Sequence, residues 1–344
     1  MFQNVKPKAV SVSTETLVRV EAGAGRQLPL VLQPGVAGVN LVDWTRSNAS
    51  MIEGLLAEQG ALLFRNFSFS GVSQFEECAR ALVPDLIEYG ERSSPRTRLS
   101  AGIYSSTDHP PDQPIVLHNE QSYTLNWPMK LWFFCAQPAP EGGRTPIADS
   151  RKIYQRLRGD IVERFTEKQV LYVRNYGGGL GLPWQEVFQT DDQLEVARQC
   201  RSAGIQIEWK SGGRLQTRQV RPAVRRHPRT GEMSWFNHAY FFHPSSLQQS
   251  AREAMLAVVD EDEIPFNTFY GDGSAIEPDV LEEIRNAYEG ETVSFPWQQH
   301  DLLLIDNMLV SHGRESYRGP RKIVVAMGQP VAAESVGQYA ERVG

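Results

Sequence analysis

The sequence predicts a mainly β protein with helical decoration (α+β), built around a β-sandwich or a β-barrel. Short runs of apolar, β-branched and aromatic residues recur along the chain, as in buried strands. Aromatic residues make up 10% of the sequence, and 28 glycines and 21 prolines supply the many turns that such a fold requires. A Rossmann domain is not expected, because the dense glycine cluster at residues 177–181 lacks the GxGxxG spacing that opens a dinucleotide-binding helix.

Two helices are expected in the first quarter of the chain. Apolar residues spaced at i, i+3 and i+4 from Ile52 predict a helix that ends at Gly60. The pair Ser73 and Glu76 has the spacing of a capping box, so a second helix is expected to begin at Ser73. Pro84 is expected to end or kink that helix.

The remaining elements follow from local signals further along the chain. Ser150 is expected to cap a helix that runs through Leu157. Pro278 suits the first turn of another helix, which Gly290 is expected to close. Five apolar or alternating runs have the length and the β-branched or aromatic content of buried strands. These runs are ALLF (61–64), LWFF (131–134), VLYV (170–173), LLLI (302–305) and IVVA (323–326).

Length and composition narrow the class of protein. The 344 residues carry 35 Lys and Arg against 41 Asp and Glu, a formal net charge of −6, which disfavours salt-driven binding to nucleic acid or anionic lipid. No apolar run approaches the roughly 18 residues of a membrane span, and residues 1–6 lack the apolar core of a secretory signal. Three widely spaced cysteines form neither a disulfide framework nor a CxxC metal site. We therefore expect a cytoplasmic protein with a single domain over residues 1–344, and neither nucleic-acid nor membrane partners.

One of the seven histidines is followed two residues later by a carboxylate, in the triplet His118-Asn119-Glu120. Alternate residues of a strand project from the same face, with side chains about 7 Å apart, so both could reach one metal ion. Seven histidines in a chain of this acidity yield roughly one such pair by chance. A partly buried histidine bonded to a neighbour is therefore an equal alternative for His118 on this pattern alone.

A distant histidine, His312, would complete a metal site. It follows a strongly apolar strand, an Asp306-Asn307 turn and a short apolar stretch. A histidine at the end of a buried strand points to where a cavity would open. Two imidazoles and one carboxylate on one face of an octahedron leave three positions open, an arrangement that suits Fe(II) with a bidentate co-substrate and O₂.

The sequence GPRK (319–322) begins another strand, next to that of the histidine, and its Arg321 lies nine residues after His312. Arg321 stands at the mouth of this strand. A planar, permanently charged guanidinium is the group expected to hold a dicarboxylate through two parallel hydrogen bonds. The alternative is a solvated charge at a strand edge, since Arg318 and a lysine lie beside it.

Several blocks of the sequence carry a family resemblance. They are HNEQSY (118–123), WP (127–128), FFC (133–135), EGGRTPIADSR (141–151), RNYGGG (174–179), WQEVFQT (184–190), NHA (237–239), HGR (312–314) and PRKI (320–323). Together they resemble the taurine dioxygenase (TauD/TfdA) family of Fe(II)- and 2-oxoglutarate-dependent oxygenases. The closer likeness is to the SyrP-like branch, typified by an aspartyl hydroxylase of nonribosomal peptide biosynthesis. The likeness runs from about residue 60 to residue 327, most of the chain.

The resemblance implies a double-stranded β-helix (jelly-roll, cupin-like) core with a helical and loop insertion around residues 150–230. It also implies that His118, Glu120 and His312 bind Fe(II). By the same resemblance, Arg321 pairs with the far carboxylate of 2-oxoglutarate, and the Thr145 hydroxyl contacts the same co-substrate. Catalysis would then be centred on the iron, and each turnover would consume 2-oxoglutarate and O₂.

Two departures from the family pattern bear on the reaction. The carboxylate is Glu120 where much of the family has Asp, and its longer side chain still reaches a metal. The stretch VVAM (324–327) lacks the arginine or polar residue that often holds an acidic substrate, which argues against a sulfonate such as taurine. Halogenating relatives have Gly or Ala in place of the carboxylate, so a glutamate at position 120 favours hydroxylation. Desaturation and cyclisation start from the same iron chemistry.

Four residues are candidate substrate contacts: Tyr123, Asn126, Asn237 and His238. Tyr123 and Asn126 follow the metal motif and would either meet the substrate or finish a loop. His238 would line the substrate pocket or pack among its aromatic neighbours. The glycine-rich stretch 177–181 is either a lid or a tight structural turn.

The expected function is hydroxylation of an unactivated C–H bond in an amino acid or an amino-acid-derived small molecule of secondary metabolism. The substrate is either free or tethered to a peptidyl carrier protein, and a homo-oligomeric state is left open. Two other classes remain. One is a non-catalytic barrel that binds 2-oxoglutarate or scaffolds an assembly, and it would form no succinate. The other is a metal-dependent hydrolase or isomerase, in which Thr145 and Arg321 are incidental and O₂ is not needed.

Overall fold

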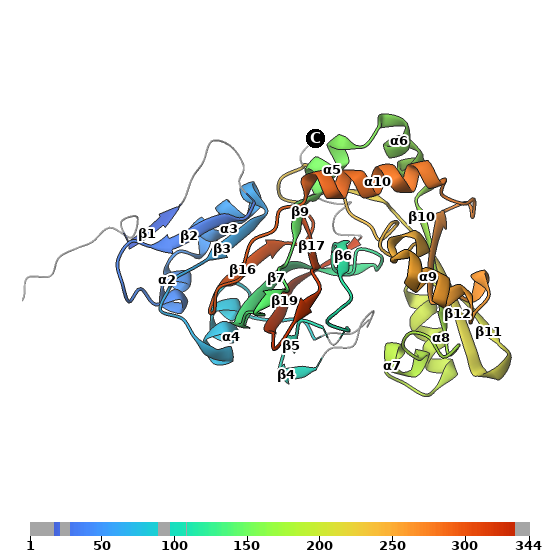
Figure 1. Ribbon diagram of the computed structural model, residues 1–344, viewed down its shortest axis with the longest axis horizontal. Helices are drawn as coiled ribbons and strands as arrows, with labels where there is room; N and C mark the ends of the chain where they lie inside the picture. Colours follow the sequence, from blue (N-terminus) through green and yellow to red (C-terminus); the bar gives the residue numbers. More distant parts are fainter. Residues whose placement is uncertain (1–16, 21–27, 89–96, 108, 334–344) are drawn as a thin grey trace, which may run out of the picture.

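Two β-sheets face each other at the centre of the molecule (Figure 1). The computed structural model describes residues 17–20, 28–88, 97–107 and 109–333, so the expectation about residues 1–6 lies outside it. The strands of the larger sheet lie in the order β1 (Val18–Val20), β2 (Leu30–Pro34), β3 (Ala61–Phe64), β16 (Leu302–Asp306), β7 (Asn126–Gln137), β19 (Lys322–Ala332), β5 (Ile103–Ser105) and β4 (Arg98–Ser100). Those of the smaller sheet lie in the order β6 (Ile115–His118), β17 (Val310–Arg314) and β9 (Ile147–Asp149). The predicted α+β fold with a jelly-roll core is confirmed, and all five predicted strands are present, four of them at the middle of the larger sheet.

The larger sheet is buried on both faces, as strand β7 illustrates. Its Leu131 and Phe133 point into the layer between the two sheets, while Trp132 and Phe134 pack on the opposite face. Strands buried on both faces have nearly continuous apolar sequences, which explains the uninterrupted runs seen in the sequence. The helices that cover the outer face are α2 (Leu41–Ser47), α3 (Ala49–Gln59) and α4 (Gly71–Leu82), drawn in blue in Figure 1.

The first two predicted helices exist, with one boundary corrected. Helix α3 ends at Gly60, whose φ of 86° is the left-handed conformation expected of a glycine stop. Helix α4 begins two residues before the predicted Ser73, and its N-cap is Ser70. The side-chain oxygen of Gln74 accepts a 2.7 Å hydrogen bond from the Ser70 N–H, so the predicted Ser73–Glu76 capping box does not form there. The helix stops before Pro84, as predicted.

The other two predicted helices are α5 (Ser150–Arg156) and α10 (Pro278–Glu291). The cap of α5 is Asp149 rather than Ser150, because the aspartate carboxylate accepts the Arg151 N–H at 2.9 Å. Pro278 occupies the first turn of α10, as predicted. Gly290 does not close α10, since the helix continues to Glu291. Instead, a Cβ on Gly290 would lie 3.0 Å from the guanidinium carbon of Arg156, so this glycine makes room for a side chain.

Between β9 and β16 the chain leaves the two core sheets and forms a lobe over residues 150–301, which includes the predicted insertion around 150–230. Besides α5 and α10, the lobe contains α6 (Gly159–Lys168), β10 (Val170–Tyr176), α7 (Trp184–Phe188), α8 (Gln193–Ser202), β11 (Gln206–Lys210), β12 (Arg214–Arg221), β13 (Val224–Arg226), β14 (Met233–Trp235), α9 (Gln249–Leu256) and β15 (Phe266–Tyr270). Strands β11, β12, β10 and β15 pair in that order as a separate sheet, at the right of Figure 1. Helices α5 and α10 contact the smaller core sheet. The short strands β8 (Glu141–Gly142) and β18 (Tyr317–Arg318) pair with each other.

A single domain over residues 1–344 stays a prediction. Within the described ranges, no helix combines the length and the apolar composition needed to cross a membrane.

The close approach of β6 and β17 depends on a glycine. A Cβ on Gly313 would lie 2.6 Å from the backbone oxygen of Ile115, so any larger residue must push the two strands apart. Gly313→Ala is therefore expected to lower the free energy of unfolding by about 1–3 kcal/mol, measured by urea denaturation.

Gly159→Ala is the matched control for this substitution. Nothing lies within 4 Å of the position that its Cβ would occupy, and the residue begins helix α6. Equal unfolding free energies for the two variants would contradict the steric role of Gly313.

Candidate active site

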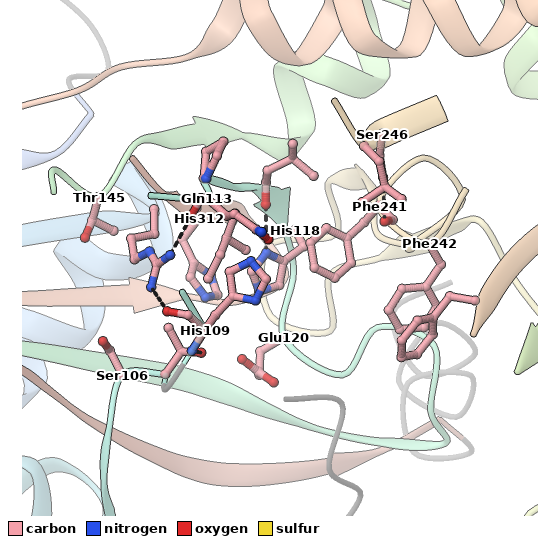
Figure 2. Close-up of a pocket in the computed structure, with 18 of the residues that line it drawn as sticks. Ser106, His109, Gln113, His118, Glu120, Thr145, Phe241, Phe242, Ser246 and His312 are labelled. Atoms are coloured by element: carbon pink, nitrogen blue, oxygen red, sulfur yellow. Dashed lines mark hydrogen bonds between the residues drawn. The ribbon is translucent and has the colours of Figure 1, made fainter. Parts of the chain in front are cut away.

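His118, Glu120 and His312 meet where β6 and β17 pair. Their potential donor atoms all lie within 4.8 Å of one another. His118 and His312 are directly opposite each other in the strand register, with ring centroids 4.5 Å apart. Figure 2 shows the three side chains gathered at the centre of a cavity. Two imidazoles and one carboxylate in this arrangement fit a divalent iron ion.

Glu120 reaches this cluster by a route that the sequence pattern did not predict. Strand β6 ends at His118, and Glu120 lies in the turn that follows, so strand alternation does not place the two side chains together. Gln121, the next residue, has a φ of 55°, which turns the chain sharply at this point. The direction of the Glu120 side chain is therefore set by the turn and by what holds the turn.

Asn307 holds that turn. Its side-chain oxygen accepts the Glu120 N–H at 2.8 Å, and its side-chain nitrogen donates to the carbonyl oxygens of Glu120 and Pro128, each at 2.8 Å. The Asn119 side chain donates in return to the Asn307 carbonyl oxygen at 2.7 Å. Asn307 is completely buried. The sequence signal for this role was a polar Asp306-Asn307 pair inside an apolar run, which we interpreted only as a turn.

The ring of His118 is fixed on two sides. Its Nδ1 lies 3.0 Å from the carbonyl oxygen of Val116, and because a carbonyl can only accept, Nδ1 carries the proton. A metal would then be bound through Nε2. Phe241 stacks on the same ring, with centroids 4.4 Å apart and planes 22° apart. Phe133 packs against the His312 ring at 5.0 Å.

The cavity beside the cluster has a volume of about 660 Å³, and both predicted co-substrate residues line it. Thr145 is buried, and its hydroxyl oxygen accepts a 3.1 Å hydrogen bond from the indole N–H of Trp297. The hydroxyl proton of Thr145 can therefore point toward a ligand.

Arg321 lines the same cavity, where its guanidinium charge can face a ligand. Its Nε donates to the Gly143 carbonyl oxygen at 2.9 Å. Burial lowers the pKa of Arg321 to about 10, so the guanidinium remains charged at neutral pH. Among the residues that the structure describes, no carboxylate forms an ion pair with Arg321, and besides burial its pKa responds most to the neighbouring Arg314. A buried cation in these surroundings is suited to a carboxylate ligand.

One detail of the Arg321 prediction was wrong. The strand that follows it, β19, does not lie next to the histidine strand β17, which pairs with β6 and β9. Strand β19 lies between β7 and β5 in the larger sheet. Arg321 and His312 therefore reach the cavity from different sheets, because the chain crosses from one sheet to the other between them.

Arg314 builds one wall of the cavity, a role that the sequence did not reveal. Its guanidinium donates to the carbonyl oxygens of His109, Pro110 and Gln113 at 2.9, 2.5 and 2.5 Å. His109 and Gln113 also line the cavity, as does Ser106. These residues come from a loop with no periodicity, so only the folded chain brings them to the metal cluster.

The four candidate substrate contacts lie outside the lining of the cavity. Tyr123 is completely buried, and Asn126 is exposed at the start of β7. The Asn237 amide donates to the Ala223 carbonyl oxygen at 2.7 Å and accepts the Ala239 N–H at 2.8 Å, so it shapes its own turn.

His238 lies behind the metal cluster. Its Nε2 is 2.9 Å from the Asn119 carbonyl oxygen, and burial holds the pKa of this imidazole well below its usual range. The ring is therefore neutral and packs edge-on to His118 at 5.7 Å. In the glycine-rich stretch 177–181, Gly181 lines the cavity, and whether the stretch moves as a lid stays open.

Comparison with known proteins gives consistent matches. Residues 25–327 match the family profile described as "Taurine catabolism dioxygenase TauD, TfdA family". The dapdiamide synthesis protein DdaC of Enterobacter agglomerans is 39% identical over 311 residues, covering 88% of this chain and 94% of DdaC. A clavaminate synthase-like protein of Arabidopsis thaliana is 27% identical over 320 residues, with 88% of this chain and 94% of that protein covered.

The fold also matches solved structures. The crystal structure of PvcB from Pseudomonas aeruginosa superposes with a TM-score of 0.57 at 17% sequence identity, covering 95% of this chain and 98% of PvcB. A second structure of PvcB is described as an Fe, alpha-ketoglutarate dependent oxygenase from an isonitrile synthetic pathway. At this identity the likeness concerns the fold.

The Asn307 contacts predict a link between this residue and metal affinity. Asn307→Leu keeps the branched shape of the side chain but removes its three hydrogen bonds to the Glu120 turn and to Pro128. We expect Mn(II) binding, measured by calorimetry, to weaken about 10–100-fold, as when other supports of metal ligands are removed.

Asn126→Leu is the control, because Asn126 is exposed at the start of β7 and lies away from the cavity lining. Its Mn(II) affinity is expected to equal that of the wild type. An unchanged Mn(II) affinity in a folded Asn307→Leu protein would show that the hydrogen bonds of Asn307 do not position Glu120.

Proposed function

The chain belongs to the TauD/TfdA family of Fe(II)- and 2-oxoglutarate-dependent dioxygenases, and from this premise we propose that it hydroxylates an unactivated C–H bond of an amino acid or an amino-acid-derived small molecule. The observation that carries the proposal is one cavity lined by His118, Glu120 and His312 together with Thr145 and Arg321. Membership of an enzyme family argues against a non-catalytic barrel.

A role in secondary-metabolite biosynthesis is supported by the relatives. DdaC is named for dapdiamide synthesis, and PvcB is described as part of an isonitrile synthetic pathway. Our proposal keeps both forms of the substrate, free or tethered to a peptidyl carrier protein. The predicted cytoplasmic location and the question of a homo-oligomer belong to the same proposal.

In the proposed mechanism, His118, Glu120 and His312 bind Fe(II). Iron bound there with 2-oxoglutarate supplies the oxidising chemistry, and the protein supplies binding and orientation. Asn307 and Phe241 keep two of the ligands in place, through the Glu120 turn and the His118 ring. These ligands are held by buried contacts, so little reorganisation is needed when the metal binds.

Arg321 and Thr145 hold the distal carboxylate of 2-oxoglutarate. The guanidinium offers paired donors, and the Thr145 hydroxyl adds one more. Leu131, Phe133 and Val325 of the larger core sheet also line the cavity, and these apolar side chains would exclude water from the bound co-substrate.

The overall reaction converts the substrate C–H bond, 2-oxoglutarate and O₂ into a C–OH group, succinate and CO₂. One oxygen atom enters the substrate, and the other enters succinate. The carboxylate of Glu120 favours hydroxylation over halogenation, because it occupies the place that a halide would need. Desaturation and cyclisation are the alternative outcomes, and the product mass separates them: hydroxylation adds one oxygen, while the other two remove two hydrogens.

Anaerobic titration with Fe(II) and then 2-oxoglutarate tests the proposal. The wild type is expected to develop a visible charge-transfer band only when both are present. His312→Ala should lose Fe(II) binding because one ligand is missing. Arg321→Leu should keep Fe(II) but bind 2-oxoglutarate about 10–100-fold more weakly, since a charged hydrogen-bonding partner of the carboxylate is gone.

Arg318→Leu is the matched control, because Arg318 is an exposed arginine in β18 outside the cavity lining. It should titrate like the wild type. Bound Fe(II) without a band on adding 2-oxoglutarate would overturn the oxygenase proposal in favour of a metal-dependent hydrolase or isomerase.

A further inference from the structure

The cavity has two chemically different ends, one on each side of the metal cluster. Figure 2 shows Thr145 and Ser106 on one side of His118 and His312, and Phe241, Phe242 and Ser246 on the other. The first end belongs to the co-substrate in the proposed function. The second end, here called the lobe end, is formed by the segment 150–301. Its larger lining side chains are Leu182, Phe241, Phe242, Leu247, Met255 and Phe266.

Among the residues that the structure describes, no charged side chain lines the lobe end. The charged side chains that line the cavity are Glu120, Arg314 and Arg321. Glu120 is one of the three candidate metal ligands, Arg314 holds the loop that contains His109, and Arg321 lies at the co-substrate end. An ammonium or a carboxylate placed at the lobe end would therefore lose water without meeting a charged side chain in the lining, which is costly.

The polar side chains at the lobe end are already engaged. The hydroxyl of Ser246 donates to the Phe241 carbonyl oxygen at 3.0 Å. The Nδ1 of His243 accepts the Ser245 N–H at 3.1 Å, so a neutral ring carries its proton on Nε2. Burial, together with the charge of Arg252, lowers the pKa of His243 to about 4, and the ring is therefore uncharged at neutral pH. The imidazole offers one neutral donor, which suits a carbonyl oxygen.

We propose that the lobe end binds an uncharged, apolar group, and that the substrate is an amino-acid derivative whose amino and carboxyl groups are masked as amides or esters. This inference rests on the proposed function in taking the metal cluster as the reaction centre. When a side-chain carbon of an amino acid lies at the reaction centre, the amino and carboxyl groups of the same molecule are only a few bonds away from that centre. In a free amino acid both groups are charged, and the described residues that line the lobe end include no charged partner for either.

Met255 is the position at which this binding can be altered with least damage to the fold. It lies on α9, a helix with no buried residues, and its side chain lines the cavity. The neighbouring Leu256 is 44% exposed and lies outside the lining. A tryptophan at position 255 should fill part of the lobe end, whereas one at position 256 should point to solvent.

The closing experiment compares three probes on the full chain loaded anaerobically with Mn(II) and N-oxalylglycine, a non-reacting analogue of 2-oxoglutarate. The probes are N-acetyl-L-leucine methylamide, free L-leucine and N-acetyl-L-asparagine methylamide, and binding is measured by calorimetry. The first differs from the second in charge and from the third in side-chain polarity at similar size. We expect it to bind about tenfold or more tightly than either of the others.

In the same assay, Met255→Trp should weaken binding of N-acetyl-L-leucine methylamide about tenfold or more, and Leu256→Trp should leave it unchanged. Equal or tighter binding of free leucine or of the asparagine derivative would overturn the inference, as would failure of the leucine derivative to bind or an equal effect of both tryptophans. If N-oxalylglycine itself does not bind the Mn(II) protein, the proposed function fails and this inference fails with it.

Discussion

The pairing of β6 with β17 is the constraint on which the candidate site depends. This pairing places His118 directly opposite His312, although 193 positions separate them in the sequence. It requires Gly313, because the Ile115 carbonyl oxygen occupies the space of a side chain. The Asn307 amide then fixes the Glu120 turn to the chain that leads into β17. Two strands and one turn thus define all three potential ligands, and the apolar layer between the sheets keeps those strands in place.

Buried polar links join the lobe to this core. Arg151 is almost completely buried and forms two ion pairs. One is with Asp149, at the end of core strand β9, at 2.8 Å, and the other is with Glu232 of the lobe, at 3.0 Å. His227 of the lobe lies 3.1 Å from Asp306, the residue before the Asn307 clamp. A buried cation is tolerated when it is fully hydrogen-bonded, and Arg151 also donates to two backbone carbonyls of α3. The lobe therefore has fixed anchor points beside the site that it helps to enclose.

This arrangement divides the chemistry between two parts of the chain. The three candidate metal ligands, Thr145 and Arg321 all come from the core sheets and their connecting turns, where backbone pairing limits movement. The lobe end of the cavity comes from loops and from the exposed helix α9, whose side chains can change without disturbing the core. Loops carried on a rigid scaffold are a general location for residues that choose a substrate.

The sequence by itself determined the central strands, because runs such as 302–305 are apolar on every residue and match strands buried on both faces. It also indicated the metal cluster and Arg321, since their side-chain chemistry is characteristic and the surrounding blocks resemble one family. Helix ends were less certain. Asp149 caps α5 in place of the expected Ser150, because neighbouring polar residues can cap a helix equally well, and α4 begins two residues before the expected Ser73. Tertiary structure alone decided three features: the hydrogen bonds of Asn307 to the Glu120 turn, the loop that Arg314 holds against the cavity, and the lack of charged side chains in the described lining of the lobe end. These depend on contacts between segments tens to hundreds of residues apart, and no local pattern in a single sequence records such contacts.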